Sequence, residues 1–139
     1  MYNLNRFIEA QNKDYDKALN EIKNGKKLTH WIWYIFPQLK ELGFSNTSIY
    51  YGISSIEEAK EYLKNEYLNN HLIEITKALL SLENNDIEDV FGYPDNLKVK
   101  SCMTLFYYAS NNEIFKKVID KFYNGEFDIN TIKLIKSTN

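Results

Sequence analysis

The chain has 139 residues, a net charge of −2 at pH 7 and one cysteine, Cys102. This length favours one domain with its own core, and the weakly acidic balance argues against nucleic-acid binding, which needs a concentrated positive field. A lone cysteine predicts a reducing, cytoplasmic compartment and no metal cluster, and we expect neither a membrane span nor a secretory signal, because no long apolar run is present.

A long amphipathic helix is predicted at the start of the chain. Apolar residues recur every three or four positions over residues 4–22, and Asn24-Gly25 supplies a left-handed stop that is common at helix ends. An aromatic segment over 29–39 follows, and Pro37 should end its helix near Phe36.

The middle of the chain is predicted to be less regular. Residues 42–52 are rich in Gly, Ser and Asn, and they predict a loop with one helical turn. Ser54 and Ser55 each stand three residues before a glutamate, which is the capping-box signature of a helix start. A break at Asn65 or at Asn69-Asn70 should divide that helix from a second one.

The last third of the chain predicts four more helical segments. They cover residues 86–92, 96–109 and 114–122, with a short last helix capped by Asp128 or Asn130. Strand signals are weak throughout. The patterns together predict an all-α fold, a compact single-domain bundle of about seven short helices over residues 1–139.

The aromatic segment 29–39 mixes large rings with polar groups. Buried polar atoms cost about 1–3 kcal/mol each unless they find partners, so the segment is either a core helix with satisfied polar groups or the wall of a site. Trp33 and Tyr34 could stack on a planar ligand or simply pack in the core. His30 could act as a general acid or base, or only cap the helix.

A second group of candidates could form a cationic end of such a site. Lys98 and Ser101 are three residues apart and share a helix face, so they could hold an anion, although Asp95 at the helix start competes for the same donors. Near the first helix, Arg6 could clamp a phosphate or carboxylate, or form a surface salt bridge, and Gln11 lies close by in sequence.

The motifs resemble a bacterial family of unknown function whose members are often labelled "calpastatin". The string His-Trp-x-Trp-Tyr-Ile-Phe-Pro-Gln-Leu at 30–39 carries the resemblance, together with Tyr-Gly-Ile at 51–53 and Phe-Gly-x-Pro-Asp at 91–95. It implies a compact, mainly helical domain. True calpastatin repeats are disordered inhibitors, whereas this aromatic-rich composition is typical of a folded chain.

A shorter stretch is similar to another family. Residues 7–11 resemble an aromatic-x-x-Ala-Gln helix of the NADAR family, which implies activity on ADP-ribose-type substrates. That family carries a catalytic Glu three residues before the aromatic, a position that Leu4 occupies here. Glu9 is the nearby carboxylate that could replace it.

These observations lead to one main hypothesis, a polar and aromatic pocket for a nucleotide-like or phosphorylated small molecule, without a cofactor. The protein could be an enzyme, a hydrolase of ADP-ribose-type substrates. In that case His30 is the acid–base candidate, Lys98 or Arg6 the charge stabiliser, and Gln38 the amide that orients water or substrate. The ligand-binding residues would be Arg6, Gln11, Trp33, Tyr34 and Ser101. The alternatives are a non-enzymatic protein-interaction module and a purely structural role for these residues. The sequence leaves the oligomeric state open.

Overall fold

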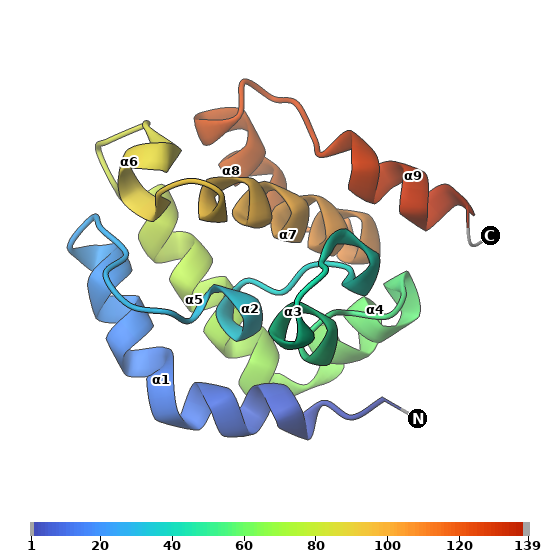
Figure 1. The fold of residues 1–139 in the computed structure, drawn as a ribbon. Helices are drawn as coiled ribbons and strands as arrows, with labels where there is room; N and C mark the ends of the chain where they lie inside the picture. Colours follow the sequence, from blue (N-terminus) through green and yellow to red (C-terminus); the bar gives the residue numbers. More distant parts are fainter. Residues whose placement is uncertain (1, 138–139) are drawn as a thin grey trace.

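The computed structural model describes residues 2–137 (Figure 1). That part of the chain contains nine α-helices, one 3₁₀ helix and no strand beyond an isolated parallel bridge between Leu39 and Ile53. The helices are α1 (Asn5–Lys23), α2 (Ile32–Ile35), the 3₁₀ helix η1 (Lys40–Leu42), α3 (Asn46–Tyr50), α4 (Ile56–Lys64), α5 (Glu66–Leu80), α6 (Ile87–Phe91), α7 (Asp95–Ser110), α8 (Glu113–Phe122) and α9 (Ile129–Ser137). The all-α prediction is confirmed, with more helices than the expected seven.

The extra helices are short ones that periodicity alone does not resolve. The predicted loop 42–52 contains α3, which starts because Ser45 accepts a hydrogen bond from the Ser48 N–H at 3.1 Å. Within the aromatic segment α2 spans only four residues and ends with Phe36 as its C-cap, one residue before Pro37, as predicted.

Side-chain caps set the starts of α4, α5 and α9 where the sequence placed them. The Ser55 hydroxyl accepts from the Glu58 N–H at 3.2 Å, which is one half of the predicted capping box, and the Glu58 carboxylate returns to the N–H of Ser54 rather than to that of Ser55. Asn65 is the break between α4 and α5, and its side chain accepts from the Leu68 N–H. Asp128 caps α9 by accepting from the Thr131 N–H at 3.1 Å.

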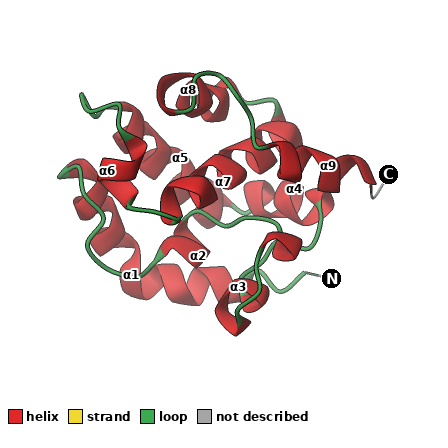
Figure 2. Ribbon diagram, turned by 45° about the horizontal axis from the view of Figure 1, so that its top comes forward, coloured by secondary structure: helices red, strands yellow, loops and turns green. Residues whose placement is uncertain are grey.

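The core is a single cluster of buried hydrophobic side chains, to which α1, α2 and α4–α9 all contribute. α7 contacts α4, α6, α8 and α9 and lies centrally in the bundle (Figure 2). Aromatic rings supply much of this core; its largest fully buried side chains include Phe7, Trp31, Phe36, Tyr62, Phe106 and Phe115. No helix among the described residues is long and apolar enough to cross a membrane.

The connecting segment, residues 24–55, joins α1 to α4 and lies across one face of the bundle, between α1 and α7 (Figures 1 and 2). Much of its backbone is outside regular helix, so its N–H and C=O groups need partners from elsewhere. Three buried polar side chains of α1 bind this segment: Arg6, Gln11 and Glu21.

Glu21 holds the start of the aromatic segment. Its Oε1 accepts from the Leu28 N–H at 2.7 Å, the Thr29 N–H at 3.0 Å and the Trp31 indole N–H at 2.9 Å. Its Oε2 accepts from the Thr29 hydroxyl at 2.7 Å. Burial alone would raise the pKa of this carboxyl, but these four donors lower it from 4.5 to about 2.

We predict that Glu21→Gln destabilises the fold by roughly 2–4 kcal/mol in urea unfolding at pH 7, because the amide group turns a donor toward backbone N–H groups. The carboxylate's contribution is present above pH 4.5 and is lost as the pH falls toward 2. The difference between the two proteins should therefore shrink at pH 3. The exposed control Glu83→Gln should match the wild type at both pH values, and a Glu21→Gln protein of wild-type stability would contradict this account.

Candidate functional site

A hollow of about 200 Å³ lies between α1, α2 and the end of α3. Three tyrosines and four charged side chains line it, with one small residue: Arg6, Glu9, Ala10, Lys13, Asp14, Tyr34, Tyr50 and Tyr51. We call it the α1/α3 hollow. It gathers aromatic rings and titratable groups from segments that are far apart in the chain, and such a concave group of side chains is a candidate small-molecule site.

A tyrosine–carboxylate pair stands at this hollow. The Tyr34 hydroxyl donates a short hydrogen bond to Asp14 Oδ2 and also lies 3.2 Å from the His30 carbonyl oxygen. Burial and the bond to the carboxylate raise the pKa of Tyr34 far above its usual value, so the phenol stays protonated. The ring of Tyr51 lies 5.1 Å from that of Tyr34, between centroids, and extends the aromatic wall.

The α1 side of the hollow carries mixed charge. Glu9 and Lys13 are exposed and Asp14 is half-buried, so all three are within reach of solvent. Asp14 Oδ1 lies 3.8 Å from the Lys17 ammonium, a long and largely exposed contact that adds little stability. The carboxylates of Glu9 and Asp14 are therefore acceptors that a ligand could use.

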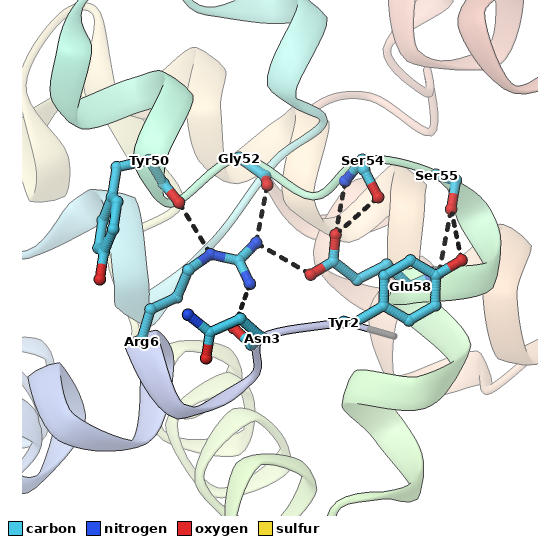
Figure 3. Close-up of polar contacts among 8 residues, drawn as sticks. All are labelled: Tyr2, Asn3, Arg6, Tyr50, Gly52, Ser54, Ser55 and Glu58. Atoms are coloured by element: carbon cyan, nitrogen blue, oxygen red, sulfur yellow. Dashed lines mark hydrogen bonds and ion pairs between the residues drawn. The ribbon is translucent and has the colours of Figure 1, made fainter.

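Arg6 lines the hollow but is occupied by the protein itself (Figure 3). Its Nε donates to the Tyr50 carbonyl at 2.8 Å and its Nη2 to the Gly52 carbonyl at 2.9 Å. Nη2 is also 2.9 Å from Glu58 Oε2 in a buried salt bridge, and Nη1 donates to the Asn3 carbonyl. The predicted anion clamp thus serves as a tether for residues 50–52.

Gln11 is buried in a hydrogen-bonded network below the hollow. Its amide donates to the Tyr34 carbonyl at 2.8 Å and to the Tyr62 hydroxyl at 3.0 Å, and its Oε1 lies 2.9 Å from His71 Nδ1. The His71 ring stacks on Tyr15 with centroids 3.6 Å apart and planes 2° apart. Gln11 therefore supports the backbone of Tyr34 rather than facing the hollow.

A second part of the predicted site, Trp33 and Lys98, does come together. The Lys98 ammonium lies 4.3 Å from the Trp33 ring centroid, a cation–π contact. The same ammonium is 3.0 Å from Asp95 Oδ1, and the nearly buried Lys27 is 2.9 Å from Asp95 Oδ2. Asp95 thus pairs with both lysines. The prediction that it competes for the donors at the helix start was wrong, because the N-cap of α7 is Pro94 and no side chain caps this helix. This cluster does not line the α1/α3 hollow.

The remaining predicted residues do not line the hollow. His30 is exposed just before α2, and Gln38 is buried with its backbone carbonyl accepting from the Ile53 N–H. The Ser101 hydroxyl is 3.1 Å from Asp128 Oδ2 and joins α7 to α9. Of the eight residues singled out from the sequence, the α1/α3 hollow contains Arg6 and Tyr34.

Sequence reasoning did not single out Lys13, Asp14, Tyr50 and Tyr51. The signal on α1 was available, because residues 6–14 place polar groups three or four positions apart, on one helix face. The two tyrosines gave no such signal, because they lie at the end of a one-turn helix, α3, whose position depends on tertiary contacts. Among the described residues, no group of three His, Cys, Asp or Glu side chains could hold a metal ion.

Comparisons with known proteins place the chain in a family. Residues 1–135 match the family described as "Protein of unknown function (DUF1810)". The chain is similar to the crystal structure of the conserved hypothetical protein Rv1873 from Mycobacterium tuberculosis, with 41% identity, 96% of each chain covered and a TM-score of 0.94. No curated protein matches the chain.

The network around Gln11 predicts how the stability of the fold depends on pH, because it contains His71. Burial lowers the pKa of His71 below 6.5, although Glu74 and Asp16 oppose the shift. The unfolded chain then binds more protons than the folded one near pH 6, so stability falls as the pH drops through 6.5 toward the lower folded value. We expect NMR titration of the His71 ring to give a pKa below 6.5; a value above it would show that the carboxylates dominate.

Proposed function

The chain belongs to the DUF1810 family of unknown function, and we propose, from the geometry of the α1/α3 hollow, that it binds a ribose-bearing, nucleotide-like small molecule there. The observation that carries this proposal is the meeting of Tyr34, Tyr50 and Tyr51 with the carboxylates of Glu9 and Asp14. Carboxylates accept hydrogen bonds from sugar hydroxyls, and tyrosine rings offer faces to a base or sugar ring.

Size and charge restrict the ligand further. A hollow of about 200 Å³ is smaller than the roughly 300–1,000 Å³ of sites for drug-sized ligands, so it suits one ring of a nucleotide rather than the whole molecule. Glu9 and Asp14 disfavour a phosphate deep inside the hollow, whereas the exposed Lys13 at its edge can pair with one. The ligand would therefore place its ribose inside and its phosphate outside.

Hydrolysis of an ADP-ribose-type substrate is the reaction that best fits this site. The residue at the position of the catalytic Glu of the NADAR family is Leu4, which has no group to activate water. Glu9 lines the hollow and is the carboxylate available as a general base. It would take a proton from water as the water oxygen bonds to the anomeric carbon, while the glycosidic bond breaks and the leaving group takes the bonding electrons.

A protein-interaction module is the second candidate function. Phe44 is 95% exposed, and Ile49 and Tyr50 on α3 are also exposed. The three residues lie close together in sequence, and neighbouring exposed apolar side chains can form a contact surface. Phe44 does not line the α1/α3 hollow, so Phe44→Ser should leave ligand binding intact and separates the two functions.

Binding is tested by titrating ADP-ribose into the protein by isothermal calorimetry. We expect Asp14→Asn and Tyr34→Phe each to weaken binding by about tenfold, because each removes one member of the hydroxyl–carboxylate pair at the hollow. The control Asp120→Asn alters an exposed carboxylate on α8 that pairs with Lys116, and it should bind like the wild type. Equal affinity in all four proteins, or no binding by the wild type, would refute the proposal.

Catalysis is tested separately by incubating the protein with O-glycosides of ADP-ribose and separating the products by chromatography. Glu9→Gln keeps the shape of the side chain but removes the base, so we expect turnover to fall by about 10²–10⁴-fold while ADP-ribose still binds. Turnover that is unchanged in Glu9→Gln would exclude this residue as the base. If the wild type binds ADP-ribose but turns over none of the glycosides, the proposed hydrolysis is refuted and the proposed binding stands.

A further inference from the structure

We propose that Glu58 is a positioning residue for the α1/α3 hollow, acting on Tyr50 and Tyr51 through Arg6. Glu58 does not line the hollow. Its effect on a ligand rests on the proposed function, whereas its effect on the two tyrosines does not. The inference begins from the cluster drawn in Figure 3, where side chains of α1 and α4 meet the backbone of residues 50–54.

Arg6 fixes the backbone on both sides of Tyr51. Its guanidinium donates to the carbonyl oxygens of Tyr50 and Gly52, at 2.8 and 2.9 Å. These two carbonyls flank the residue whose ring packs 5.1 Å from Tyr34 and 4.8 Å from Tyr50, between centroids. A shift of the guanidinium would therefore move the tyrosines that form one wall of the hollow.

Glu58 fixes the guanidinium. Its Oε2 is 2.9 Å from Arg6 Nη2, the nitrogen that also donates to the Gly52 carbonyl. Its Oε1 accepts from the N–H and the hydroxyl of Ser54, at 2.7 and 2.9 Å. Only 3% of the Glu58 side chain and 9% of the Arg6 side chain is exposed, so water cannot replace either partner easily. The carboxylate thus connects the tether to the start of α4.

Residue 52 transmits this constraint because its backbone is closely packed. A Cβ atom at Gly52 would lie 2.5 Å from Lys40 Cα and 2.9 Å from the Ser48 carbonyl oxygen, so only glycine fits there. The segment is held against η1 and α3 on one side and by Arg6 on the other. Loss of the Arg6 contacts would leave the carbonyls on both sides of Tyr51 without the hydrogen bonds that fix their position.

The test uses Glu58→Gln in the full chain, with tyrosines replaced biosynthetically by 3-fluorotyrosine. Fluorine NMR of the unliganded protein then reports on Tyr50 and Tyr51, whose resonances are assigned from Tyr50→Phe and Tyr51→Phe. We expect both resonances to shift or broaden in Glu58→Gln. In calorimetry with ADP-ribose as the probe, we expect about tenfold weaker binding.

Two further variants separate positioning from a general loss of stability. Asp128→Asn alters the carboxylate that binds Ser101 and Thr131, and none of these three residues lines the hollow. This variant should lower stability without moving the Tyr50 or Tyr51 signals or the affinity. Ser54→Ala removes one of the two Ser54 contacts of Glu58, and it should give a smaller change in the same direction even if Glu58→Gln fails to fold.

The outcomes are distinct. Unchanged Tyr50 and Tyr51 resonances in Glu58→Gln and Ser54→Ala, or equal changes in Asp128→Asn, would overturn the role of Glu58. Changed resonances with wild-type affinity would overturn its influence on the ligand. Failure of the wild type to bind ADP-ribose would refute the proposed function instead, and the fluorine spectra would still decide whether Glu58 positions the tyrosines.

Discussion

The structure depends on three buried polar side chains of α1 that hold a mostly irregular segment in place. Backbone groups outside helices must find hydrogen-bond partners when a chain folds over them. Glu21 accepts from two N–H groups near the start of this segment, Gln11 donates to the carbonyl of Tyr34, and Arg6 donates to two carbonyls near its end. Three positions spread along α1 thus hold residues 28–52 in place. This segment supplies one wall of the hollow.

This arrangement explains why the candidate site lies where it does. The inner groups of α1 bind the segment, and the neighbouring Glu9, Lys13 and Asp14 remain accessible beside it. Tyr34 contacts both the buried and the accessible side chains of α1. Its carbonyl accepts from the buried Gln11, and its hydroxyl donates to the accessible Asp14. The position of the phenol at the hollow is therefore set by the same contacts that fold the segment.

The helices were largely predictable from the sequence because their signals are local. Caps such as Ser55 and Asn65 act over three residues, and Pro37 limits the helix beside it. The site was less predictable because its residues are distant in sequence: Arg6 and Tyr50, which both line the hollow, are 44 residues apart. Residue type indicates that Arg6 can bind an anion, but only the fold shows that backbone carbonyls and Glu58 already occupy it.

A buried ion pair is weak evidence for stability, because desolvation of both charges opposes their attraction. The Arg6–Glu58 pair is different from an isolated pair, since both groups also bind backbone that would otherwise be unsatisfied. An apolar pair of the same volume would leave the carbonyls of residues 50 and 52 without these donors. The pair therefore selects one conformation of the segment, and a site built from Tyr50 and Tyr51 needs such a fixed conformation to discriminate between ligands. The contacts of Arg6 and Glu58 cost desolvation energy when the chain folds, and the same contacts give the hollow a defined shape.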